Sequence, residues 1–122
     1  MPWLTIPAVL QIIVGLGLLN VWIVRPVSPT SYRGGTAQTL REEFAAYGLP
    51  AAAFWIVGAL KVGAALLLIA GVWLPLPVDI AAGVVAFLMI GALAMHMKVS
   101  DPPMKSLPAL LMLAMSVGII LL

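Results

Sequence analysis

Residues 51–74 read AAAFWIVGALKVGAALLLIAGVWL and carry a single charged side chain, Lys61. A helix that crosses the hydrocarbon core of a bilayer needs about 20 mostly apolar residues. Three further stretches meet that requirement, at residues 4–24, 80–97 and 106–122. The sequence therefore predicts an all-α integral membrane protein, a single domain over residues 1–122 with four transmembrane helices.

The composition of the whole chain supports this class of protein. Of its 122 residues, 64% are hydrophobic and 8% are charged, whereas a soluble domain carries about 25% charged residues. Water could not cover so much apolar side chain on a chain this short, which excludes a soluble enzyme. A disordered or nucleic-acid-binding protein would need a dense run of charge, so no nucleic acid partner is expected.

Side chains that serve metal, thiol or redox chemistry are scarce. The chain has no cysteine and one histidine, His96. Disulfides, thiolate sites and multi-histidine metal or haem sites within one chain are therefore excluded, so no metal site is expected. Nothing indicates a covalent cofactor. The N-terminal segment also lacks the basic region of a cleaved signal peptide.

The connections between the spans predict how the helices are arranged. Residues 75–79 and 98–105 form short links, so sequential helices must pack antiparallel in an up-down-up-down bundle. The first connection, residues 25–50, is long. Within it, Thr39 and Glu42 have the spacing of a capping box, and Gly48 and Pro50 supply a stop.

One face of that loop segment is apolar, with its side chains at helical spacing: Leu40, Phe44 and Tyr47. We therefore expect a short amphipathic helix over residues 39–47 that lies at the membrane interface.

The loop cations predict the orientation, because cytoplasmic loops carry an excess of Lys and Arg. They all fall in the first and third connections: Arg25, Arg33, Arg41, Lys98 and Lys105. Both termini are expected to face away from the cytoplasm. Four tryptophans near span ends are typical of an aromatic belt: Trp3, Trp22, Trp55 and Trp73.

Lys61 is the most unusual residue, because it lies about 15 Å into its span, near the bilayer centre. Small residues mark helix–helix contacts, and Gly58, Ala64 and Ala65 share its face, so Lys61 is expected to point into the bundle. Three interpretations are open. Lys61 forms a buried pair with Glu42, Glu43 or another polar group, or it acts in binding or proton handling, or it snorkels or is uncharged.

Four other side chains are candidates for ligand binding, each with a structural alternative. His96 suits a proton relay or a ligand contact, and otherwise is an interfacial residue bonded to water or to the helix end. Glu42 and Glu43 are either bonded within the cap or solvated, unless one folds inward toward a ligand headgroup. Asn20 lies inside the first span, where an interhelical hydrogen bond is the simpler role.

Three further polar residues are expected to be structural. Gln11, in the first span, is expected to make an interhelical hydrogen bond. Asp79 stands at the start of the third span, where a carboxylate complements the free amides and the helix dipole. Asp101, which two prolines follow, is typical of a turn.

Several motifs resemble those of a known family. YRGG at residues 32–35, TLREEF at 39–44 and YGLP at 47–50 resemble the first-loop pattern of the DoxX-like membrane proteins. The likeness continues through GAL at 58–60, residues 66–71 and GALAMHMK at 91–98, with Asp101 and Pro102 following.

The resemblance implies a small four-helix protein of the bacterial inner membrane. Relatives include subunits associated with thiosulfate:quinone oxidoreductase and proteins linked to oxidative or quinone stress, and most members have no assigned activity. Such proteins commonly carry Glu after Gly-Ala-Leu in the second span, where this chain has Lys61. A carboxylate role is therefore not carried over to this position.

Three classes of function remain open. The favoured one is an accessory subunit, not itself an enzyme, that holds a lipophilic small molecule or docks a partner protein. A quinone as ligand is implied by the resemblance alone. The second is a small membrane enzyme, an isomerase or a quinone-linked redox protein, whose Lys, His and Glu would do acid–base work. The third, a four-span transporter, is disfavoured because no Asp or Glu lies within the apolar core of any span. Expected partners are membrane lipids, a membrane protein or a second copy.

Overall fold

The computed structural model describes residues 2, 4–24, 26 and 32–122, so the expectations for Trp3 and Arg25 lie outside the described residues. Its helical elements follow in the order α1 (Ile6–Leu19), η1 (Asn20–Val24), α2 (Leu40–Ala46), α3 (Ala51–Ala70), α4 (Val78–Lys98), η2 (Pro103–Ser106) and α5 (Leu107–Leu121). Helix α1 continues into η1, which is a π-helical turn, and the 3₁₀ turn η2 leads into α5.

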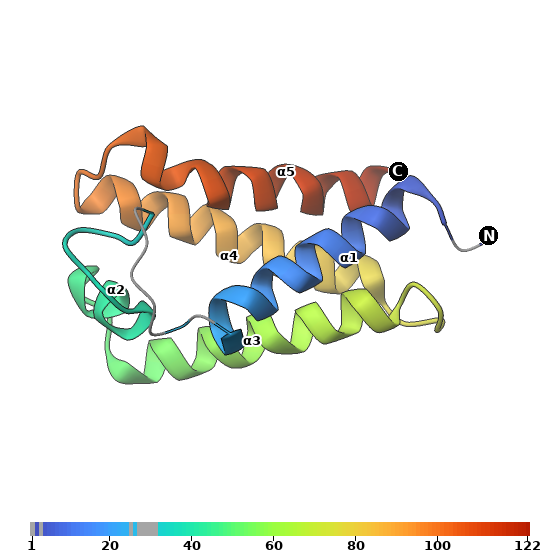
Figure 1. Ribbon diagram of the computed structural model, residues 1–122, viewed down its shortest axis with the longest axis horizontal. Helices are drawn as coiled ribbons and strands as arrows, with labels where there is room; N and C mark the ends of the chain where they lie inside the picture. The colour runs from blue at the N-terminus through green and yellow to red at the C-terminus, as the bar shows by residue number, and fades with distance from the viewer. Residues whose placement is uncertain (1, 3, 25, 27–31) are drawn as a thin grey trace.

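Within the described residues, four long helices form an antiparallel bundle (Figure 1). They are 19, 20, 21 and 19 residues long when η1 and η2 are counted with their helices. At about 1.5 Å per residue, each is about as long as the hydrocarbon core is thick. Each helix packs against two neighbours, in the order α1, α3, α4, α5 and back to α1. The prediction of an all-α bundle with four spans is confirmed.

Close packing of small residues holds the bundle together. Because lipid is as apolar as the side chains, helices in a membrane associate mainly through tight contact. Gly15 of α1 lies against α3, where a Cβ on Gly15 would be 2.5 Å from Ile69 Cγ1 and 2.9 Å from the carbonyl oxygen of Ala65. The contact between α1 and α3 therefore requires a residue without a side chain at this position.

The second span ends earlier than the sequence predicted, at Ala70 instead of residue 74. Residues 71–74 form a turn in which two amides bond to carbonyls three residues back, the tighter pattern that often closes a helix. Pro75 follows and cannot continue a helix. Helix α4 begins at Val78, slightly before the predicted start, and Asp79 lies in its first turn as expected for a carboxylate there.

Gln11 joins α1 to the end of α3. Its buried side chain donates from Nε2 to the carbonyl oxygen of Leu68, at 2.9 Å. Leu68 is one of the last four residues of α3, whose carbonyls cannot all be paired within the helix. In a bilayer no water would satisfy such a group. The interhelical hydrogen bond expected of Gln11 is present.

The predicted short helix is α2, which lies over the end of the bundle opposite to residues 71–77 (Figure 1). The hydroxyl of Thr39 accepts from the Glu42 amide at 3.1 Å, as a capping box requires. The Glu42 carboxylate, however, accepts from the amide of Gln38 at 3.1 Å. Gly48, with φ +77°, closes the helix in a left-handed conformation, which confirms the predicted stop.

Candidate functional site

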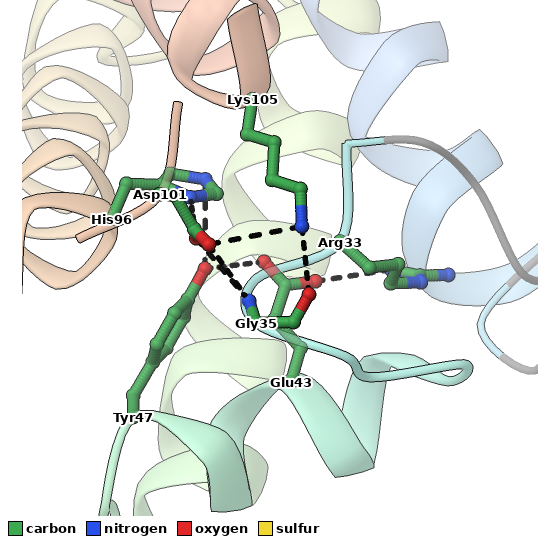
Figure 2. A network of polar contacts seen from close by, with 7 residues as sticks. All are labelled: Arg33, Gly35, Glu43, Tyr47, His96, Asp101 and Lys105. Atoms are coloured by element: carbon green, nitrogen blue, oxygen red, sulfur yellow. Dashed lines mark hydrogen bonds and ion pairs between the residues drawn. The ribbon is translucent and has the colours of Figure 1, made fainter. Parts of the chain in front are cut away.

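Three segments, two from the first loop and one from the second half of the chain, meet at the α2 end of the bundle (Figure 2). They are the loop at residues 33–35, the end of α2, and the connection between α4 and α5. Their side chains and backbone groups form what we call the polar network, made of Arg33, Gly35, Glu43, Tyr47, His96, Asp101 and Lys105.

The geometry of the α4–α5 connection brings His96 and Asp101 together. Ser100 has a left-handed φ of +57°, and the amide of Asp101 bonds to the carbonyl of His96 at 2.9 Å. These are the features of a Schellman motif, in which the residue after the left-handed one folds back onto the last helical turn, usually through an apolar contact. Here the contact is polar: His96 Nδ1 lies 2.8 Å from Asp101 Oδ2.

Asp101 is the centre of the polar network. Its side chain is 4% exposed, and its two oxygens accept from the amide of Gly35 at 3.0 and 3.3 Å. Lys105 Nζ lies 3.7 Å from Asp101 Oδ1 and donates to the Gly35 carbonyl at 2.7 Å. Burial by itself would raise the pKa of Asp101, but the hydrogen bonds from His96 and Gly35 and the charge of Lys105 outweigh it and lower the pKa below its usual value.

Glu43 and Tyr47 form the other half of the network. The Tyr47 hydroxyl donates to Glu43 Oε1 at 2.6 Å and lies 3.5 Å from His96 Nε2. Arg33 Nη1 donates to Glu43 Oε2 at 3.4 Å. Burial and the nearby Glu43 carboxylate raise the pKa of Tyr47, which therefore stays protonated as a donor. Gly34 leaves room for this arrangement, because a Cβ there would overlap the Tyr47 ring.

A cavity of about 740 Å³ lies between the helices beneath the polar network. Its walls are largely apolar and come from all four spans and α2, with Leu18, Val57, Leu88 and Met112 among them. Some lining residues are exposed on the outside of the bundle, where Val21 is 37% and Phe87 74% exposed. The cavity therefore opens toward the surface that faces the lipid.

Trp22 forms part of the cavity wall. It lies in the π-helical turn η1, and its ring packs against Phe44 and Phe54 with centroids 5.7 and 5.1 Å apart. A Cβ on Gly58 would be 2.6 Å from the Trp22 ring, so Gly58 allows the indole to lie against α3. The sequence predicted only that Trp22 belongs to the aromatic belt near the span ends. In the structure its ring also lines the cavity.

Lys61 lines the same cavity from α3. Its Nζ lies 5.7 Å from the centre of the Trp22 ring, within the range of a cation–π contact. Across residues 4–24 and 32–122, no ion pair or hydrogen bond includes the Lys61 ammonium. Of the three interpretations of Lys61, a direct ion pair with Glu42 or Glu43 is not formed. Glu43 is bonded to Arg33 and Tyr47 instead and acts on Lys61 only through Coulomb attraction without direct contact.

The structure brings four of the five candidate residues to one place. Asn20, Glu43, Lys61 and His96 all line the cavity. Glu42 does not line this cavity. Because successive residues of a helix point about 100° apart, Glu42 faces outward when Glu43 faces in, and its side chain is exposed.

Five members of the polar network were not predicted from the sequence as site residues, namely Arg33, Gly35, Tyr47, Asp101 and Lys105. Asp101 follows His96 by five positions, which is the spacing of the paired residues in a Schellman motif. The motif was not recognisable in the sequence, because Ser100 stands at the left-handed position where glycine is usual. The helical spacing places Tyr47 on the apolar face of α2, and no sequence pattern indicates a hydrogen-bond partner for its hydroxyl.

Four apolar helices around a loop-covered cavity define a small multi-pass membrane protein. A family model described as the DoxX-like family matches residues 30–119, so the chain belongs to the DoxX-like family and the resemblance is confirmed. The matched range contains the whole polar network and Lys61. Comparison with curated proteins and with solved structures gave no match.

Proposed function

We propose that the protein binds a lipophilic small molecule with an oxygen-bearing headgroup, such as a quinone, in the cavity. The observation that carries this proposal is the cavity itself, whose 740 Å³ falls within the roughly 300–1,000 Å³ of small-molecule sites. Apolar walls suit a hydrocarbon or ring system, and polar groups at the α2 end suit a headgroup. The opening toward lipid gives such a molecule a path that avoids water.

In this proposal the protein is an accessory component of membrane redox or stress functions, and not itself an enzyme. Membership of the DoxX-like family supports a link of this kind. Four-helix bundles commonly hold ligands between facing helices. Membrane lipids, together with a partner membrane protein or a second copy, are the proposed partners.

Trp22 provides a direct test, because quinones quench indole fluorescence on contact. We expect a short-chain benzoquinone to quench the purified protein saturably in lipid nanodiscs, and the saturable part to disappear in Trp22→Phe. Trp73→Phe is the matched control, because Trp73 lies at the opposite end of the bundle, is 56% exposed and does not line the cavity. Linear quenching that is the same in all three proteins would contradict the proposal.

A quinone-linked redox enzyme or an isomerase is the alternative, and one observation favours it. The Asp101 carboxylate fixes His96 from the Nδ1 side, and His96 itself lines the cavity. A carboxylate-oriented imidazole beside a ligand is a common general base. Turnover of an added quinol or enone that is lost in His96→Gln would favour this alternative, and haem or flavin absorption in the purified protein would identify a redox cofactor.

We further propose that the protein lies in the bacterial inner membrane with its α2 end in the cytoplasm. Arg33, Arg41, Lys98 and Lys105 support this orientation, because all four lie at the α2 end, and residues 71–77 contain no Lys or Arg. The chain has no cysteine, so single cysteines can be placed at will. In spheroplasts, an impermeant thiol reagent should label Leu122→Cys and spare Gln38→Cys. The reverse pattern would overturn the orientation.

A further inference from the structure

Lys61 is the charge in the cavity lining that makes no direct ion pair with any other group of the described chain. It lies ten residues into α3, at the middle of the span. Its ammonium lies over the face of the Trp22 ring, 5.7 Å from the centroid, and the Glu43 carboxylate acts on it only as a Coulomb attraction without direct contact. An aromatic face attracts a cation but carries no net charge.

The other charged groups around the cavity are matched. Arg33 is paired with Glu43 at 3.4 Å, and Lys105 is paired with Asp101 at 3.7 Å. Glu43 also accepts from the Tyr47 hydroxyl, so each of its two oxygens already accepts one hydrogen bond from another residue. The opposite charges within each of these two pairs cancel. The ammonium of Lys61 is therefore the net charge that remains at the cavity wall.

An ammonium in the middle of a membrane is unfavourable unless an anion or a polar group compensates it. The low dielectric that makes an isolated charge unfavourable also strengthens a pair with an opposite charge. A molecule that carries one negative charge on an apolar body would supply what the protein lacks. Its body would occupy the apolar part of the cavity, next to Leu18, Leu88 and Met112.

We propose that the ligand of this cavity is a lipophilic monocarboxylic acid, whose carboxylate pairs with Lys61. This inference rests on the proposed function. It specifies that the oxygen-bearing headgroup is an anion, in place of the neutral carbonyl groups of a quinone. One ammonium favours one negative charge, so a long-chain acid fits better than a headgroup with several charges.

The test compares an acid with the alcohol of the same chain in nanodiscs of neutral lipid at neutral pH. The probe is cis-parinaric acid, whose fluorescence rises on binding, and the competitors are palmitic acid and hexadecanol. We expect palmitic acid to compete about tenfold or more better than hexadecanol, as a charge-assisted hydrogen bond allows. In Lys61→Met the two competitors should become equivalent.

Three variants serve as controls. Lys61→Arg should retain the preference for the acid, and Lys61→Gln replaces Lys61→Met if that variant does not fold. Arg41→Met removes a cation from the outer face of α2, which does not line this cavity, and should leave the preference unchanged.

Equal competition by acid and alcohol in the wild type, or an acid preference that survives in both Lys61→Met and Lys61→Gln, would overturn the inference. If the acid preference is absent but the Trp22-dependent quenching by quinone persists, the proposed function stands without it. If neither acid, alcohol nor quinone binds, the proposed function fails as well.

Discussion

Replacement of Gly15 by valine should lower the stability of the bundle by about 3 kcal/mol, the upper part of the range for overpacked positions. A Cβ at this position would be 2.9 Å from the backbone oxygen of Ala65, which cannot move without displacing α3. Ile69 would have to change its side-chain conformation as well. Unfolding by SDS in mixed micelles measures the loss.

Gly63→Val is the matched control for this prediction. It makes the same substitution within a transmembrane helix, but nothing lies within 4 Å of a Cβ built on Gly63. Its side chain would face lipid, so we expect a change within about 0.5 kcal/mol, as at ordinary surface positions. Similar losses in both variants would show that α1 and α3 are not in the close contact described above.

Asp101→Asn is expected to destabilise the protein by about 2–4 kcal/mol, because removing one partner leaves other buried groups incompletely paired. Asparagine carries no charge to balance Lys105 and fewer acceptor sites for His96 and Gly35. The control is Asp79→Asn, an exposed carboxylate in the first turn of α4, whose loss should cost about 0.3–1 kcal/mol. Thermal melting in detergent compares the two. Equal losses would mean that Asp101 contributes no more than a helix-terminal charge.

The same carboxylate gives the protein a defined pH dependence. The pKa of Asp101 is lowered in the folded state, so its ionised form stabilises the fold above the unfolded pKa of about 3.9. That contribution is lost as the pH falls through the folded pKa. The melting temperatures of wild type and Asp101→Asn should therefore converge on acidification below about pH 4. A constant difference down to strongly acidic pH would contradict this assignment.

The sequence predicted those parts of the fold that depend on local information. Apolar runs give the spans, and the capping box at Thr39 with the stop at Gly48 gives α2. The small residues around Lys61 correctly placed it toward the interior, where it lines the cavity. In the loop between α3 and α4, by contrast, the turn at residues 71–74 shortened the span, because hydropathy does not register where backbone hydrogen bonds change their spacing.

The partners of the site residues could not be predicted, because they come from segments whose relative positions are set by the whole bundle. One interpretation of the sequence paired Lys61 with Glu42, Glu43 or another polar group, yet Glu43 is bonded to Arg33 from a different part of the loop and to Tyr47. Asp101 has three partners, and Gly35 is 66 positions away from it in the chain. Contacts at such separations leave no periodic pattern in the sequence.

The polar network also bears on how the protein is made. Lys105 and the Gly35 carbonyl that it contacts are 70 positions apart, so the loop at residues 33–35 and α2 are synthesised long before their partners. During co-translational insertion the Gly35 backbone therefore stays without its hydrogen bonds to Asp101 and Lys105 until the connection to α5 has emerged from the ribosome. Closure of the network therefore requires that α4 and the connection after it have been made, and a chain that stops before Lys105 leaves the loop at residues 33–35 incompletely bonded at the membrane surface.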